Sequence, residues 1–521
     1  MSEQAEKKTG AFNRMLDGIE RFGNKMCDPA TMFLVLTAIV LVVSCICGLC
    51  NVQAVNPATG DVIVAQNLIS RDGFRKLWSE AVAQYQAFPS LAMVLVTMLG
   101  VGVADKTGLL TVSIRRLLQR VPKKLVTAMV VMVGICANAA GDAGFYIYPP
   151  LVGLIYLGLG RNPILGLLTA FGSLCAGFTA TFFPAIGDVL CYGFTLPAAQ
   201  VLDPNYVASP MLNYYFTFVS VFLLTIVGTF VSEKIIAPRF GEYDKSQLDP
   251  DDQMNLNITE LTDDQKKGLK WSGISLLIAF AVLVFLCVGP GKLLADDQTG
   301  GLTTSNAPFM KGIVLSITLL FLIPGIVYGV ITKQIKRDTD VVKLMAQSLN
   351  GMTPFLVLIF FVAQFMAVFN WSNLGVIISI KGAELLKNIG LTGIPLLVVF
   401  ILVSSLLNLF TASQSAKWAI MAPIFVPMMM LLGYDPAVTQ CAYRIGDSIT
   451  NCLTPLFIAV PICVGFINRY DKKAGLGTVI ANMIPFSLVM GVIWIIFFAI
   501  WISLGIPLGP GAGIVYTLPG A

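Results

Sequence analysis

A succession of long apolar runs constrains this chain more than any other feature of its sequence. Several of the runs reach the roughly 20 residues that a helix needs to cross a bilayer. Only 12% of the 521 residues are charged, against about 25% in soluble proteins. The sequence therefore predicts an all-α polytopic membrane protein. The apolar runs cover residues 28–50, 88–104, 123–160, 163–198, 213–236, 271–289, 309–332, 346–371, 393–434, 436–468 and 478–505.

Two of these runs, 123–160 and 393–434, are too long for a single crossing. At about 1.5 Å per residue each exceeds the roughly 30 Å hydrocarbon core. Both carry small and polar residues near the middle, at NAAGD (138–142) and TASQS (411–415). We interpret both runs as re-entrant helical hairpins, which leaves nine full transmembrane helices. The chain is predicted to be one membrane domain, 1–521, with a first half at about 28–236, a cytoplasmic linker at 237–270 and a second half at about 271–505.

The lysine and arginine residues indicate which side of the membrane each loop occupies. With a cytoplasmic N-terminus, 25 of the 34 fall in cytoplasmic segments, seven fall outside, and Lys417 and Arg444 lie within the membrane. This distribution satisfies the positive-inside rule. We therefore expect a multi-pass protein with a cytoplasmic N-terminus and an external C-terminus.

The two halves resemble each other in the placement of proline and glycine. Pro150, Gly160 and Pro163 of YPPLVGLIYLGLGRNP have counterparts at a constant offset of 273 in MAPIFVPMMMLLGYDP. The two copies have opposite predicted orientations, which is typical of secondary transporters built from inverted repeats. Chance similarity between two apolar, proline-punctuated stretches is the alternative interpretation.

Several classes of chemistry are excluded or disfavoured by composition. The chain contains no histidine, so it has no histidine-dependent catalytic triad or zinc site. Most of the eleven cysteines lie in apolar runs, and the CxxC at Cys47 and Cys50 has no second pair nearby, so we expect free thiols. No phosphate-binding glycine loop or EF-hand loop is present. We therefore predict no cofactor and no nucleotide-driven step.

The most polar stretch within apolar sequence runs from residue 404 to 461. Arg444 and Asp447 are three residues apart, so on a helix they share a face and can pair. Charges inside a membrane usually belong to a transport pathway or a binding site, although a purely structural ion pair is the alternative. The residues after Asp447, SITNCLTP, favour an unwound helix whose carbonyl groups, with the carboxylate, form a cage for a small cation.

Three further side chains are candidates for the same site. Asp188 lies in the matching segment of the first half, GFTATFFPAIGDVL, where it either contributes to the site or caps a helix. Trp418 can stack on an aromatic ligand, or it can simply pack against protein or lipid. Lys417 can attract a carboxylate, pair with an acid or extend its ammonium toward the surface, and these alternatives stay open.

Four motifs together resemble the AbgT family of aminobenzoyl-glutamate transporters: SAKWAIMAPIFVPMMMLLGY, AYRIGDSITN, FNWSNLG and LGIPLGPG. The resemblance extends along essentially the whole chain. It implies a homodimer in the bacterial inner membrane, with nine membrane helices and two hairpins in each subunit. It also implies transport of p-aminobenzoyl-glutamate or efflux of sulfonamide antimetabolites, coupled to protons or sodium.

The resemblance also implies roles for particular residues. Ion coupling is implied at Asn408, Asp447 and Asp188, with Asn408 and Asp447 as candidate sodium ligands. No family role is carried over to Lys417 or Asp142. The residues implied to bind substrate are Asp188, Ser415, Trp418, Pro436, Arg444, Asp447 and Pro455.

We therefore expect an ion-coupled secondary transporter, an antiporter or an importer, that works by alternating access and is not an enzyme. A carboxylate transporter of the same architecture with another substrate is the first alternative, and it does not need Trp418. An intramembrane aspartyl protease using two of Asp142, Asp188 and Asp447 is a further alternative, but neither Asp142 nor Asp447 lies in a GxGD signature. A passive channel is the last alternative function.

Overall fold

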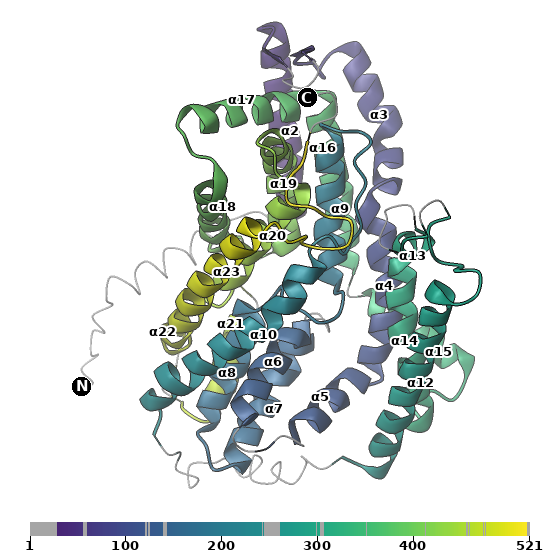
Figure 1. Ribbon diagram of the computed structural model, residues 1–521, viewed down its shortest axis with the longest axis vertical. Coiled ribbons are helices and arrows are strands. Elements are labelled where there is room, and N and C mark those ends of the chain that lie inside the picture. Colours follow the sequence, from purple (N-terminus) through teal and green to yellow (C-terminus); the bar gives the residue numbers. More distant parts are fainter. Residues whose placement is uncertain are drawn as a thin grey trace, which may run out of the picture.

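Helices form most of this fold (Figure 1). The computed structural model describes residues 29–55, 60–119, 122, 125–138, 143–241, 243, 261–297, 300–302, 307–350, 352–411, 413–454, 457, 459–472, 474 and 476–517. The helices of the first half are α2 (Pro29–Leu49), α3 (Arg71–Gln86), α4 (Pro89–Lys106), α5 (Leu109–Gln119), α6 (Val126–Ala137), α7 (Ala143–Gly158), α8 (Pro163–Ala176), α9 (Ile186–Gln200) and α10 (Tyr214–Phe230), which continues as a π-helix (Val231–Ile236) and a 3-10 turn (Ala237–Arg239).

The described part of the second half contains more helices than that of the first and ends in a second π-helical segment followed by α23. Between α2 and α3, the strands β1 (Gln53–Val55) and β2 (Val62–Val64) form a short antiparallel hairpin. The helices of the second half are α12 (Asp263–Val288), α13 (Pro308–Lys311), α14 (Ile313–Ile331), α15 (Asp338–Asn350), α16 (Thr353–Trp371), α17 (Leu374–Asn388), α18 (Gly393–Asn408), α19 (Gln414–Leu431), α20 (Pro436–Thr450), α21 (Ala459–Ile467), α22 (Leu476–Pro485), the π-helix Phe486–Met490 and α23 (Gly491–Ser503).

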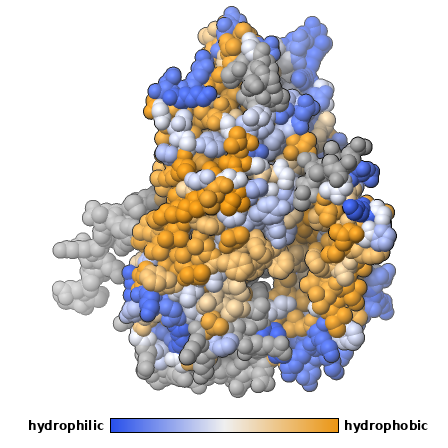
Figure 2. Space-filling model, in the orientation of Figure 1, coloured by the Kyte–Doolittle hydropathy of each residue, from blue (hydrophilic) through white to orange (hydrophobic). Residues whose placement is uncertain are grey.

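The outer surface is apolar where a bilayer would surround it. Among the described residues, six helical segments are long and apolar enough to cross a membrane, and the pair α15–α16, bent by 51°, makes a seventh. Helix α12 exposes Leu277, Ile278 and Phe285. Exposing such large apolar side chains is unfavourable in water but favourable in the hydrocarbon of a bilayer. Figure 2 shows apolar residues across the middle of this face and hydrophilic residues at its upper and lower ends. The chain is therefore a multi-pass membrane protein.

The helices fall into an outer set and a central set. On one side α12 packs against α14, and both α14 and α15 pack against α4, while α2 packs against α16. Helix α9 contacts both α4 and α19, and so joins this outer set to the centre. Helices α3 and α17 lie at one end of the molecule and α5 lies at the other (Figure 1).

Helix pairs occur at both predicted hairpins. Helices α6 and α7 flank the first predicted tip, of which residues 139–142 lie outside the described part of the chain, and α18 and α19 flank the second. Helix α8 packs against both members of the first pair, and α20 packs against both members of the second. Whether nine helices cross the bilayer and two hairpins re-enter it depends on where the bilayer lies relative to the helices. This count stays a prediction, and so does the inverted repeat.

Two predicted crossings are interrupted in the middle. The run 163–198 forms α8 and α9 with a non-helical segment at 177–185, and the run 436–468 forms α20 and α21 with a break that begins at residue 451. The expected break in the helix after Asp447 is therefore present, but it begins at Asn451, so Asp447 itself is helical. Asp447 lies in the last turn of α20, because the helix continues to Thr450 before the sequence NCLTP ends it.

Helices α18 and α20 approach each other closely at Gly446. A Cβ atom at Gly446 would lie 2.5 Å from the carbonyl oxygen of Ile401 and 2.7 Å from Cβ of Ser404. Only glycine allows two helix backbones to come this near. This close contact places the C-terminal ends of α18 and α20 side by side, where the charged residues of the chain's centre lie.

Candidate functional site

Four helix ends meet near the centre of the protein. The first turns of α9 and α19 carry Asp188 and Lys417, and the last turns of α18 and α20 carry Asn408 and Asp447. These side chains are buried. The charged ones take part in two ion pairs, and no side chain in either pair is more than 8% exposed. Since water does not reach such charges, each must be balanced by another side chain or by a helix end.

Arg444 of α20 is paired with Asp188 of α9. The Nη1 atom of Arg444 lies 2.6 Å from Oδ1 of Asp188, and its Nη2 atom donates to the carbonyl oxygen of Thr179 at 3.2 Å. The other carboxylate oxygen of Asp188 accepts from the amide of Ala185 at 2.6 Å. Asp188 therefore both caps α9, where a helix N-terminus favours a negative charge, and neutralises Arg444.

Lys417 of α19 is paired with Asp447 of α20. The Nζ atom lies 2.6 Å from Oδ1 of Asp447 and also donates a short hydrogen bond to Oδ1 of Asn408. The second carboxylate oxygen, Oδ2 of Asp447, is buried without a hydrogen-bond donor among the described residues. Of the three possibilities open for Lys417 from sequence, the structure shows pairing with an acid.

The predicted pairing of Arg444 with Asp447 is therefore wrong. Residues three apart on a helix point about 60° apart around its axis, which is close enough to pair but also close enough to face two different neighbours. Here Arg444 faces α9 and the segment before it, whereas Asp447 faces α18 and α19. The local spacing indicated a shared face, and tertiary packing decided the partners.

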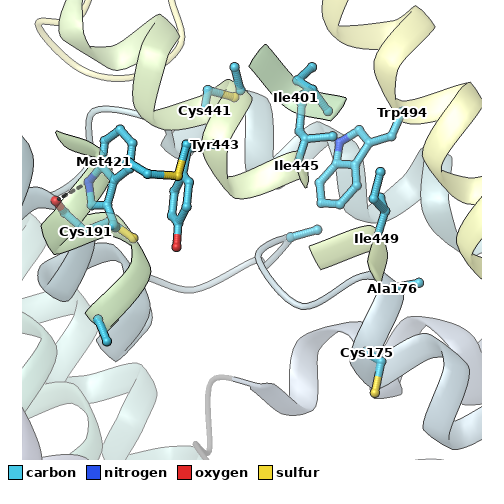
Figure 3. Packing of buried hydrophobic residues seen from close by; sticks show 14 of the residues in the cluster. Cys175, Ala176, Cys191, Ile401, Met421, Cys441, Tyr443, Ile445, Ile449 and Trp494 are labelled. Carbon is cyan, nitrogen blue, oxygen red and sulfur yellow. Dashed lines mark hydrogen bonds between the residues drawn. The ribbon is translucent and has the colours of Figure 1, made fainter. Parts of the chain in front are cut away.

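Trp418 is fully buried between α9 and α20. Its ring stacks on Tyr443, with 4.3 Å between ring centroids and 22° between planes, and its Nε1 donates to Oγ1 of Thr195 at 2.9 Å. The Nε1 atom also lies 3.2 Å from the carbonyl oxygen of Cys191, which Figure 3 marks with a dashed line. Trp418 packs against protein in this conformation. Its predicted role as a platform for an aromatic ligand stays a prediction.

The other predicted substrate residues are less closely grouped. Ser415 is half-buried in the first turn of α19, beside the charged centre. Pro436 begins α20, eleven residues before Asp447 and hence about 16 Å away along the helix, so the structure does not bring it to the charges. Pro455 and Asp142 lie outside the described residues.

A polar chain that the sequence did not single out extends from Trp418. Thr195 accepts from Trp418 and donates to Oε1 of Gln440 at 2.6 Å, and Nε2 of Gln440 donates to Oδ1 of Asn213 at 2.9 Å. Gln414, at the start of α19, has a buried Nε2 atom without an acceptor among the described residues. Isolated amides and hydroxyls carry little sequence signal, although Gln440 lies four residues before Arg444 on the most polar helix of the core.

Asn408 and Asp447 offer oxygen atoms suited to a small cation. Sodium is a hard cation, and it prefers carboxylate and amide oxygens such as these. The described residues contain no cluster of three or more His, Cys, Asp or Glu side chains, so a transition-metal site does not arise within them. The described cysteines are all free, Cys47 and Cys50 included, as expected from the sequence.

Comparison with known proteins identifies relatives over nearly the full length. The family model of the AbgT transporter family matches residues 14–516. The p-aminobenzoyl-glutamate transport protein of Escherichia coli (strain K12) is 35% identical over 511 residues, which is 98% of this chain and 99% of that protein.

Two solved structures share the fold. The YdaH transporter of Alcanivorax borkumensis, described as having an unusual topology, is 35% identical with a TM-score of 0.87, over 93% of this chain and all of that one. MtrF of Neisseria gonorrhoeae, from a class of antimetabolite efflux pumps, is 39% identical with a TM-score of 0.90, over 96% of this chain and all of that one. These relatives are transporters and not enzymes, which removes the aspartyl protease alternative. The chain belongs to the AbgT family of transporters.

Proposed function

We propose that this protein is an ion-coupled secondary transporter that moves p-aminobenzoyl-glutamate or related aromatic compounds, sulfonamides among them, by alternating access. The observation that carries the proposal is the pair of buried ion pairs, Arg444 with Asp188 and Lys417 with Asp447, at the meeting point of four helix ends. The transport protein of Escherichia coli and the efflux pump class of MtrF supply the substrate classes.

The geometry supports this function in two ways. Charges buried at broken helices are costly, so they are retained where they bind a substrate or an ion. Each pair also links different helices: Arg444 and Asp188 join α20 to α9, and Lys417 and Asp447 join α19 to α20. A carboxylate substrate competing for Arg444, or a cation competing for Asp447, therefore loosens contacts between helices, which couples binding to movement.

A carboxylate transporter of the same architecture with a different substrate is the second candidate. The observation that favours it is the position of Trp418, whose ring is stacked on Tyr443 and whose Nε1 is already hydrogen-bonded. This candidate holds if wild type transports an aliphatic dicarboxylate at least as well as p-aminobenzoyl-glutamate, and if a folded Trp418→Ala variant keeps its wild-type transport of p-aminobenzoyl-glutamate. Loss of that transport, with folding retained, favours the first candidate.

The test is the flux of labelled p-aminobenzoyl-glutamate and of a labelled sulfonamide in liposomes that contain the purified protein. Proton and sodium gradients are imposed separately and in both directions. We expect saturable, gradient-driven accumulation with at least one of the two ions. Conductance without saturable counterflow would indicate a channel, and accumulation that responds to neither gradient would refute ion coupling.

Two variants locate the coupling within the protein. Asp447→Asn removes the buried carboxylate, and we expect it to abolish gradient-driven accumulation. Glu384→Gln is the matched control, because Glu384 is an exposed acid that pairs with Lys381 on the surface of α17. Intact accumulation and unchanged ion dependence in Asp447→Asn would show that Asp447 is not the coupling residue.

We further propose that the protein is a homodimer in the bacterial inner membrane, with its N-terminus in the cytoplasm and its C-terminus outside. The distribution of lysine and arginine supports the orientation. Cysteine labelling of α3 and α5 from each side of sealed vesicles tests it, because these two helices lie at opposite ends of the molecule.

A further inference from the structure

The ammonium group of Lys417 occupies the position where a free cation is expected. Nζ contacts Oδ1 of Asp447 and Oδ1 of Asn408, the two residues that are the candidate sodium ligands. A sodium ion and an ammonium group both bind to such oxygens, and their like charges oppose joint occupancy of one buried position. The lysine and a sodium ion are therefore alternatives at this point.

The surroundings of Nζ favour a cation. Helix α18 ends at Asn408, and Asp447 lies in the last turn of α20, so two helix C-termini with their partial negative charge meet here. In addition, Oδ2 of Asp447 is fully buried and accepts no hydrogen bond from the described residues. The carboxylate of Asp447 therefore has more acceptor capacity than Lys417 uses.

The amide of Asn408 is oriented by the residues around it. Its Nδ2 atom lies 2.7 Å from the carbonyl oxygen of Asp447, 3.0 Å from Oγ1 of Thr450 and 2.9 Å from Oδ1 of Asn451. With the donor side held by three oxygens, Oδ1 turns toward Lys417. Oδ1 of Asn408 is thus positioned by neighbours at the C-terminal end of α20, rather than by the lysine.

We propose that Lys417 is the resident cation of a site formed by Asn408 and Asp447, and that a free cation such as Na⁺ binds there only when the lysine ammonium withdraws. Exchange of one cation for the other leaves the charge of the site unchanged. Lys417 belongs to α19, whereas the oxygens belong to α18 and α20, so the exchange also releases an ion pair between α19 and α20. The inference deepens the ion coupling proposed above and rests on it.

The test measures thermal unfolding of the purified full-length protein, without substrate, in NaCl and in choline chloride at equal ionic strength and pH. The variants are Lys417→Met, Lys417→Met/Asp447→Asn, and Lys381→Met as a surface control that breaks an exposed ion pair. In Lys417→Met we expect the midpoint to rise with the logarithm of the Na⁺ concentration, because Na⁺ binds the folded state. Wild type, the double variant and Lys381→Met should show no Na⁺-specific rise.

Each outcome supports or overturns the proposal. An equal Na⁺-specific rise in wild type and Lys417→Met overturns it, since the lysine would then not compete. The absence of any rise in folded Lys417→Met also overturns it. Failure to purify Lys417→Met even in NaCl, while the double variant purifies normally, counts against it too, because Na⁺ would then be unable to balance Asp447.

A second measurement uses the wild-type sequence and does not depend on Lys417→Met. Equilibrium binding of radioactive Na⁺ is compared between wild type and Asp447→Asn in the absence of substrate. Little or no difference supports occupation of the site by Lys417, and specific binding that Asp447→Asn removes overturns it. Both measurements report cation binding rather than flux, so a failure of the transport experiment is distinguishable from a failure of this proposal.

Discussion

The Gly446→Ala substitution tests whether the close approach of α18 and α20 sets the geometry of the charged centre. The added Cβ atom would lie 2.5 Å from the carbonyl oxygen of Ile401, whereas an ordinary carbon–oxygen contact is about 3.3 Å. Helix α18 must therefore move away by roughly 0.8 Å, the difference between the two distances. A shift of that size stretches the 2.7 Å hydrogen bond from Asn408 to the carbonyl oxygen of Asp447 past the usual limit of about 3.2 Å.

The energetic effect combines two opposing contributions. Overpacking a close helix contact costs about 1–3 kcal/mol, whereas replacing glycine by alanine inside a helix gains up to about 1 kcal/mol. We expect a net loss of about 0–3 kcal/mol of stability for Gly446→Ala, and a larger relative loss of transport because the displaced Asn408 no longer faces Lys417 correctly.

The matched control is Gly273→Ala on α12, where the added Cβ atom meets no other atom within 4 Å. Only the helix-propensity gain applies there, so its thermal midpoint should equal or exceed that of wild type. The assays are thermal unfolding in detergent and flux of labelled p-aminobenzoyl-glutamate in liposomes. If Gly446→Ala unfolds at the control's midpoint and transports at the wild-type rate, the close helix contact does not set the site, and the reasoning is refuted.

Three further predictions concern other parts of the core. Trp418→Phe retains an aromatic ring but loses the Nε1 bond to Thr195, so it should lower stability by about 1 kcal/mol, and an unchanged thermal midpoint would contradict this. Arg444→Lys keeps the charge but cannot easily reach both Asp188 and the carbonyl oxygen of Thr179. We expect it to fold but to transport at least tenfold more slowly, and wild-type flux would show that charge alone suffices. Burial raises the pKa of Asp435, in the turn before α20, to about 6, so ionisation weakens the fold as pH rises from about 4 to about 6. Asp435→Asn should therefore resemble wild type at pH 4 and gain up to about 3 kcal/mol at pH 8, measured by thermal unfolding, and an equal difference at both pH values would contradict it.

The apolar helices of this fold were predictable because bilayer thickness sets both their length and their composition. The runs 28–50 and 213–236 became α2 and α10 with its π-helical extension, with ends that shift by one or two residues. Helices α3 and α17 were missed, because mixed polar and apolar residues give no continuous apolar run. Helix α12 begins at Asp263, inside the predicted linker, because Thr262 and Gln265 form a capping box there.

The sequence predicted which charged residues belong to the candidate site, but not which of them form ion pairs with each other. A charge inside apolar sequence is conspicuous, so Asp188, Lys417, Arg444 and Asp447 all stood out. Their partners depend on which helices meet, and Asp188 and Arg444 are 256 positions apart in the chain, so a single sequence gives no sign that they are in contact. The i, i+3 rule instead favoured Arg444 with Asp447, because only local neighbours are visible at that stage.

The two buried ion pairs contain two cationic and two anionic side chains, so their net charge is zero. Moving one elementary charge through a membrane potential of 100 mV costs or gains about 2.3 kcal/mol. A unit that carries Asp188, Lys417, Arg444 and Asp447 together crosses that field without electrical work when it moves empty. In the alternating-access cycle proposed above, these four residues therefore add no voltage dependence to the empty return step.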